Sequence, residues 1–145
     1  MKLSIFLFLL IISVLAGFDS GRKRIYSTKD CTENYQRVNF NLIMNSAEEY
    51  DSSFVEITGF YYLEFEASVI SNSKTGQNEK SMIWVDFRSS LIDSLEKNSN
   101  NENLFEKISG KKIKIIGRVD SKAHGHLGQY AATIKQICYL EVYNW

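Results

Sequence analysis

The sequence predicts a mainly β fold, a small five-stranded barrel with a helical connection between strands three and four. Three observations lead to this prediction. Apolar and polar residues alternate along separate short runs, aromatic residues make up 13 % of the chain, and the runs follow one another as three strands, a helical segment and two strands. That order is typical of the OB-fold. An open α+β sheet is the alternative architecture.

The first half of the expected barrel begins with a helical turn and two strands. Ser46 and Glu49 have the spacing of a capping box, which predicts a short helical turn leading into the first strand. The strands are expected at 53–62 and 67–70. Gly59 interrupts the first strand, as a bulge or bend does where a strand curls around a barrel.

The third strand is expected at 81–87, and Trp84 lies on its outward face. Leu91 and Leu95 follow at helical spacing and are expected to plug one end of the barrel, and the apolar residues of 104–108 predict a second short helical piece. Alternation along the strands assigns seven residues to the core: Val55, Ile57, Ile83, Val85, Phe87, Ile113 and Ile115.

The last two strands are expected at 111–120 and 131–142. Alternation slips near Gln136, and we interpret the slip as a bulge within one continuous strand. Between the two strands, Gly125 and Gly128 predict a tight strand-to-strand turn.

The N-terminal residues predict an export signal. Lys2 precedes the apolar run 3–15, which has the length of a signal-peptide core and is short for a membrane span. We expect cleavage after Ala16, an N-terminal arm at 17–45 whose residues 17–32 are polar, basic and solvated, and the barrel domain at 46–145. The mature protein is then secreted or periplasmic and keeps no stable membrane anchor. An uncleaved anchor helix is the alternative.

The chain contains two cysteines, Cys31 and Cys138. In an exported protein such a pair predicts a disulfide, and the spacing fits no metal motif. The bond would tie the N-terminal arm to the last strand. Two free thiols are the alternative.

Two segments resemble a group of small exported bacterial proteins of uncharacterised function with OB-fold-like domains. The segment 110–120 has the pattern GK-x-I-x-I-x-G-x-VD, and 125–134 has GHLG-x-Y-x-A-x-I. The third expected strand is similar as well, so that the resemblance extends over about 50–142. Many of those proteins are lipoproteins, but this chain has Phe18 where a lipoprotein signal needs cysteine. The resemblance implies a fold and an exported location, and no activity.

Aromatic and imidazole groups mark a candidate binding surface. Trp84 lies outside the expected core, on the face and beside the loops with which OB-folds bind sugars and oligonucleotides. Flat aromatic rings stack on sugars and bases alike. Trp84 covered by the N-terminal arm is the alternative. The candidate ligand-binding residues are Trp84, Tyr62, His124, His126 and Tyr130.

Composition and motifs restrict the function classes. The chain has 17 basic and 17 acidic residues, and this balance disfavours nucleic acid as a partner. His124 and His126 share a face in an extended segment, but two ligands do not make a metal site, so neither a metal nor a cofactor is expected. We expect a binding module for an unknown small molecule, glycan or protein, with an oligosaccharide or other small polar ligand favoured.

Two other function classes stay open. One is a protein-binding, inhibitory or structural envelope protein. The other is a hydrolase, in which acidic residues near the aromatic face (Glu64, Glu66, Asp86) act as a carboxylate pair. The chain has neither a nucleophile elbow nor a phosphate loop, and an enzyme is therefore the less favoured of the two.

Overall fold

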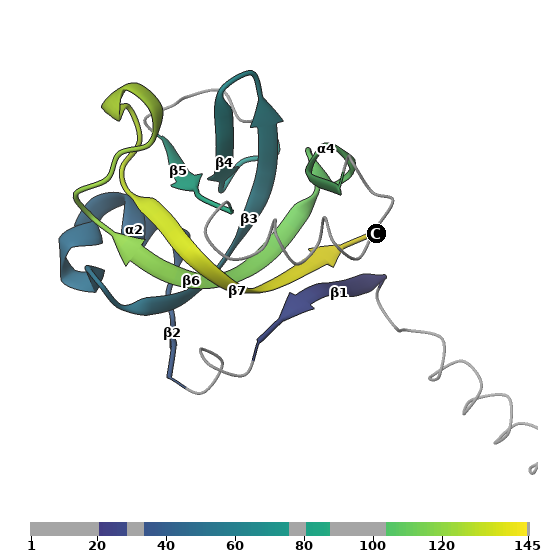
Figure 1. Cartoon of the computed structure of the whole chain (residues 1–145), viewed down its shortest axis with the longest axis horizontal. Coiled ribbons are helices and arrows are strands. Elements are labelled where there is room, and N and C mark those ends of the chain that lie inside the picture. Colours follow the sequence, from purple (N-terminus) through teal and green to yellow (C-terminus); the bar gives the residue numbers. More distant parts are fainter. Residues whose placement is uncertain (1–20, 29–33, 76–80, 88–103, 145) are drawn as a thin grey trace, which may run out of the picture.

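The computed structural model describes residues 21–28, 34–75, 81–87 and 104–144. Within these ranges no helix is long and apolar enough to cross a membrane. The expected signal peptide, Leu91 and Leu95 lie outside them. In chain order the elements are β1 (Arg22–Ser27), β2 (Gln36–Arg37), α2 (Phe40–Ser46), η2 (Ala47–Tyr50), β3 (Phe54–Glu64), β4 (Ala67–Ser71), β5 (Met82–Val85), α4 (Leu104–Ile108), β6 (Lys112–Asp120), η4 (His126–Gly128) and β7 (Thr133–Tyr143) (Figure 1).

Five strands form a closed ring of hydrogen-bonded neighbours. β3 pairs with β4 and with β6, β4 pairs with β5, and β7 closes the ring by pairing with both β5 and β6. Four of these contacts are antiparallel, and the β5–β7 contact is parallel. In sequence, α4 lies between β5 and β6. The prediction of a mainly β fold with three strands, a helical segment and two strands is thus confirmed.

The interior of the ring is the hydrophobic core. All seven residues that alternation assigned to it are buried, with Ile83 and Ile115 fully inaccessible and Val85 only 1 % exposed. Burial of each such side chain stabilises the fold by about 1.5–3 kcal/mol relative to an exposed one. Alternation therefore predicted the inward face of the three strands from which these seven residues come.

Gly59 lies where β3 changes partners. Residues 54–60 of β3 pair with β6, whereas residues 60–64 pair with β4. A Cβ atom on Gly59 would lie 2.6 Å from the backbone oxygen of Ser71 and 2.8 Å from Cγ1 of Ile70. The missing side chain thus lets β4 approach closely at the point where the ring turns, in agreement with the bend expected there.

The bulge expected in the last strand is present. Gln136 has a positive φ of 51°, and the pairing of β6 with β7 shifts register opposite it, between Ile116 and Arg118. On its other edge, β7 pairs with β5 before the bulge and with β1 after it. The bulge therefore separates the ring-closing part of β7 from the part that β1 covers.

The N-terminal segment differs from the solvated arm that the sequence predicts. Residues 22–27 form β1, which pairs antiparallel with β7 along the outside of the ring. Its charged residues are exposed, whereas Ile25 and Tyr26 are half-buried and pack against the core. An edge strand that carries charges on its solvent side resists pairing with other chains.

The helical turn before the first strand begins earlier than expected. Asn39 is the N-cap of α2, and its Oδ1 accepts a hydrogen bond of 2.9 Å from the backbone N–H of Asn41. The capping box predicted at Ser46 and Glu49 is wrong, because the Ser46 side chain makes no capping bond. The earlier start allows the helix to bury Phe40 and Ile43 in the core.

The expected disulfide remains a prediction, because Cys31 lies outside the described residues. Two contacts support it: the N–H of Thr28 donates to the carbonyl of Cys138 (2.9 Å), and Tyr35 packs against buried Cys138 and Ile116. The chain on both sides of Cys31 therefore lies beside Cys138.

We expect thiol titration of the unfolded, non-reduced protein to find no free sulfhydryl. Reduction should lower the free energy of unfolding by at most about 4–5 kcal/mol, the chain-entropy value for a loop of roughly 100 residues. Two reactive thiols before reduction would disprove the bond.

Candidate functional site

One end of the ring carries a pocket with a volume of about 560 Å³. The β3–β4 hairpin, β5, α4 and the loop 121–130 supply its walls, and we call it the aromatic pocket. Figure 1 shows the hairpin, β5 and α4 on the side of the molecule opposite β1.

Three aromatic rings pack together at one side of the aromatic pocket. Phe87 and Phe105 have ring centroids 4.7 Å apart, and Tyr61 meets Phe87 edge-on at 5.6 Å. Burial raises the pKa of Tyr61 to about 12, and its hydroxyl lies 3.2 Å from that of Ser68. Tyr61 therefore stays neutral at physiological pH, and this wall offers rings and a hydroxyl without a charge.

Trp84 forms another wall and is half-buried. Its ring lies 5.3 Å from that of Tyr130 at an angle of 52°. A Cβ atom on Gly125 would lie 2.6 Å from both rings, so only glycine lets the backbone of the loop cross them, and its φ of 63° also favours glycine. The loop 121–130 packs on this tryptophan, and among the described residues the apolar cluster that holds Trp84 has no member from the N-terminal arm.

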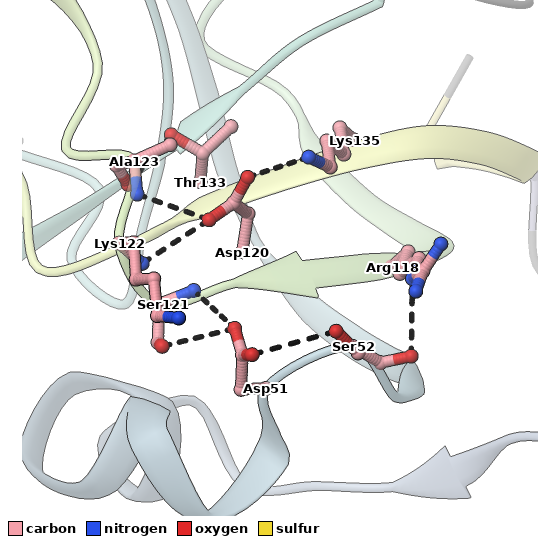
Figure 2. A network of polar contacts seen from close by, with 9 residues as sticks. All are labelled: Asp51, Ser52, Arg118, Asp120, Ser121, Lys122, Ala123, Thr133 and Lys135. Atoms are coloured by element: carbon pink, nitrogen blue, oxygen red, sulfur yellow. Dashed lines mark hydrogen bonds and ion pairs between the residues drawn. The ribbon is translucent and has the colours of Figure 1, made fainter.

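A network of hydrogen bonds fixes the start of this loop (Figure 2). Asp120 Oδ1 accepts from the backbone N–H groups of Lys122 and Ala123, each at 3.1 Å, while its Oδ2 binds the ammonium of Lys135. Asp51 Oδ1 accepts from both the N–H and the hydroxyl of Ser121 at 2.9 Å. Two carboxylates on different elements therefore hold the same turn.

The far end of the loop is tied back to its start. His124 Nδ1 lies 2.9 Å from the carbonyl oxygen of Tyr130, and since a carbonyl only accepts, Nδ1 carries the proton. The N–H of Tyr130 donates to the carbonyl of His124 at 3.1 Å, and Thr133 Oγ1 donates to the carbonyl of Ala123 at 2.9 Å. The loop is thus pre-organised beside Trp84.

The network predicts an acid-sensitive fold. The hydrogen bond from Lys135, with the two backbone N–H groups, lowers the pKa of Asp120, and the bonds from Ser121 lower that of Asp51. A carboxylate with a lowered pKa stabilises the fold above its unfolded value of about 3.9, and this contribution is lost as the pH falls below that value.

We expect the free energy of unfolding, from urea titrations between pH 6 and 2 (roughly the range in which carboxylates titrate), to fall with pH, and Asp120→Asn to flatten the curve. Glu49→Gln is the control, because Glu49 is exposed and outside this network. Equal slopes for wild type and Asp120→Asn would contradict the assignment.

Charged groups surround the mouth of the aromatic pocket. Glu64 and Glu66 come from the β3–β4 hairpin, Asp86 follows β5, and His126 comes from the loop. His126 Nε2 lies 3.2 Å from Glu66 Oε2, and this pair joins the hairpin to the loop. Glu64 and Asp86 are the other two carboxylates at this mouth.

Two large apolar side chains stand in solvent at the same two segments. Phe65, at the hairpin tip, is 93 % exposed, and Leu127, in the loop, is 75 % exposed. Each has a positive-φ residue at or beside it, Glu66 at 61° and Leu127 itself at 58°. Exposed apolar groups of this size on two neighbouring tips are a feature of contact surfaces.

The structure separates the sequence-predicted site residues. Trp84 and His126 line the aromatic pocket, and Tyr130 packs behind Trp84. Tyr62 shares an outer apolar cluster with Trp84 and Tyr130 but does not line the pocket, and its hydroxyl donates to the carbonyl of Lys74. His124 lies at the base of the loop, in a second hollow with Glu48, Asp51, Ser121 and Lys122.

The residues predicted from sequence do not include three aromatic residues of the pocket: Tyr61, Phe87 and Phe105. Phe87 was assigned to the core, where it does lie, but it also faces the open end of the ring. One feature of the sequence could have indicated its role. Phe87 is the last residue of the expected strand, and an inward side chain at a strand end lies at the open end of the ring. Within the ranges that the structure describes, no group of three or more His, Cys, Asp and Glu side chains is arranged to hold a metal ion.

No protein-family model, curated protein or solved structure matches this chain. Its function is therefore inferred from the aromatic pocket and its surroundings alone.

Proposed function

We propose that this protein is an exported binding module built on an OB-fold barrel, with the aromatic pocket as its ligand site. The order of strands around the ring, β3-β4-β5-β7-β6, together with a helix between β5 and β6 in sequence, supports the OB-fold. The predicted signal segment supports export. A secreted or periplasmic location and a small polar ligand follow from this proposal.

The single observation that carries the proposal is the pocket of about 560 Å³ with aromatic walls. Sites for small ligands commonly have about 300–1,000 Å³, apolar walls and a few polar groups that fix orientation. Here Trp84 and Phe105 are half-buried rings on which a flat ligand stacks. The carboxylates of the mouth accept hydrogen bonds from hydroxyl or amino groups, so an oligosaccharide is one ligand class that fits.

The test is a glycan and oligonucleotide array probed with the purified protein at two salt concentrations, because nucleic-acid binding falls steeply with salt. For the ligand found, we expect Trp84→Ala to weaken binding by about tenfold or more in calorimetry, since stacking on one aromatic ring is worth about 1–3 kcal/mol. The same substitution should cost about 2 kcal/mol of stability, because Trp84 also packs on Tyr130.

Tyr62→Ala is the matched control, since Tyr62 is an aromatic residue of the same outer apolar cluster as Trp84 but does not line the pocket. Its ligand affinity should equal that of the wild type. Equal affinity of Trp84→Ala and wild type would place the ligand elsewhere and end the proposal.

A second candidate function is binding of another protein, and the exposure of Phe65 and Leu127 favours it. Apolar side chains at the centre of a protein interface carry much of its binding energy. Phe65→Ser with Leu127→Ser should then abolish complex formation with the partner while leaving small-ligand affinity unchanged. A small-ligand affinity that falls with the double substitution would assign both side chains to the ligand site.

A further inference from the structure

We infer that the outer surface of β1, β7 and β6 binds an anionic polysaccharide, that is, a sugar chain that carries carboxylate or sulfate groups. The site consists of four cations, Arg22, Arg24, Lys112 and Lys114, and we call it the basic face. None of the four lines the aromatic pocket. The inference therefore goes beyond the proposed function and does not depend on it.

The sheet brings these cations together from distant parts of the sequence. Figure 1 shows β1 lying along β7, which pairs with β6 on its other edge. Lys112 and Lys114 point outward from β6, because the residues on either side of Lys114 are buried in the core. Glu141 of β7 lies opposite Arg24 on one edge and opposite Lys114 on the other, and opposite residues of antiparallel strands share a face. The basic run 22–24 alone is short for a polyanion site, and β6 extends it.

The positive charge of the basic face is not neutralised by its neighbours. Within the part of the chain that the structure describes, no ion pair involves any of the four cations. Glu141 is the carboxylate that lies between them. Its Oε2 accepts a hydrogen bond from the hydroxyl of Tyr139, and its Oε1 is buried without a hydrogen-bond partner, so neither Arg24 nor Lys114 is bonded to it. Four positive charges thus surround one negative charge in a chain whose formal net charge is zero.

Two tyrosine rings hold three of the cations in position. The guanidinium of Arg22 lies 4.9 Å from the centroid of Tyr143, and the ammonium of Lys112 lies 5.7 Å from the same centroid. The guanidinium of Arg24 lies 5.6 Å from the centroid of Tyr139. A guanidinium that lies over a ring keeps the N–H donors at its edge, which match a planar oxyanion such as a carboxylate. Side chains that are already ordered lose less conformational freedom when an anion binds.

The same features favour a polysaccharide over two other polyanions. Single-stranded nucleic acid binds by stacking its bases on aromatic rings, but cations of the chain itself already lie over Tyr139 and Tyr143. A peripheral protein binds an anionic membrane with exposed apolar side chains as well as with cations. The large exposed apolar side chains of the described residues all lie outside β1, β6 and β7. An anionic sugar chain requires neither stacking nor insertion.

The experiment measures binding of the purified protein to three polymers with one backbone: uncharged dextran, carboxymethyl dextran and dextran sulfate. We expect at least one charged polymer to bind about tenfold or more tightly than uncharged dextran, and its affinity to fall as the salt concentration rises. The charged polymer that binds more tightly identifies the acid group. Duplex DNA and vesicles of anionic lipid, at the same salt concentrations, are the competing polyanions.

Variants that remove two lysines locate the site. Lys112→Gln with Lys114→Gln should weaken binding about tenfold and lower the slope of the salt dependence by about two, or about one for each lost contact. Lys74→Gln with Lys122→Gln is the matched control, because it removes the same charge from exposed positions outside the basic face, and it should bind as the wild type does. Urea transitions report whether both proteins are folded. Arg22→Gln, at an exposed position of the edge strand, should weaken binding several-fold and decides the question if the β6 variant is unfolded.

Four results would overturn the inference. Equal binding of the charged and uncharged dextrans, or of none of them, would show that the protein does not recognise an anionic sugar chain. Equal losses in the two lysine pairs would assign the attraction to net charge and not to the basic face. Tighter binding of duplex DNA or of anionic vesicles than of either charged dextran would give the basic face a different partner. Loss of polysaccharide binding in Trp84→Ala would place the sugar chain in the aromatic pocket, and would support the proposed function instead.

Discussion

Val85→Asp is expected to unfold the protein. Val85 is 1 % exposed and belongs to the core. It lies in β5, which pairs with β4 on one edge and with β7 on the other. An unpaired carboxylate at this place costs several kcal/mol or protonates, while total stability of a domain of this size is about 5–15 kcal/mol. Loss of the near-ultraviolet circular dichroism signal and of the urea transition would report the unfolding.

Two control variants distinguish the effect of a buried charge from the loss of apolar volume and from the addition of a carboxylate elsewhere. Val85→Ala removes apolar volume without adding charge and should cost about 2 kcal/mol, which leaves a cooperative transition. Ser27→Asp adds the same carboxylate at an exposed position of β1 and should be nearly neutral. A folded Val85→Asp protein with a transition close to that of the wild type would show that the inward face of β5 is assigned incorrectly.

The strands and their inward faces were predictable because alternation is a local property. Ile83 and Val85 face inward because side chains two residues apart share a side of a strand, and no knowledge of partners is needed to see this. The bulge at Gln136 was predictable for the same reason, since an extra residue shifts the alternation. Gly59 combined both signals, an inward position and a missing side chain.

The pairing of β1 with β7 was not predictable by such means. The residues 22–24 are charged and were expected to be solvated, and their side chains are indeed exposed. Their contacts are with residues more than a hundred positions later in the sequence. The guanidinium of Arg22 lies over the ring of Tyr143, and that of Arg24 lies 5.6 Å from the centroid of Tyr139. A basic run can thus form the outer face of a strand when the neighbouring strand carries aromatic rings that its guanidinium groups contact.

The candidate site was predictable in part. Trp84 could be placed outside the core because its neighbours on β5 alternate with it. The aromatic pocket itself could not be foreseen, because Tyr61 and Phe105 lie 6.4 Å apart although they are distant in sequence. Such a pocket forms only when the ring of strands closes and brings the end of β3 against α4. No single segment of the sequence predicts that closure.

Gly59 offers the sharpest test of that closure. It belongs to the inward row of β3 together with Val55, Ile57 and Tyr61, and all four are buried. An added Cβ would lie 2.6 Å from a backbone oxygen of β4, a separation that real Cβ atoms do not reach, and a backbone atom cannot move aside alone. The strand β4 must therefore shift, and with it the hairpin that bears Glu64 and Glu66.

We expect Gly59→Ala to cost about 3 kcal/mol in urea titrations, the upper part of the usual range for an overpacked core, with the slope of the transition unchanged. Gly21→Ala is the matched control, because a Cβ there meets only the Cα of Asn144 at 3.8 Å, and it should be neutral. Gly59→Ala should also weaken ligand binding, since the shifted hairpin carries one wall of the aromatic pocket. Equal stability of the two alanine variants would show that β3 and β4 can move apart at Gly59 without loss of stability. The close approach of β4 would then not be required for closure of the ring.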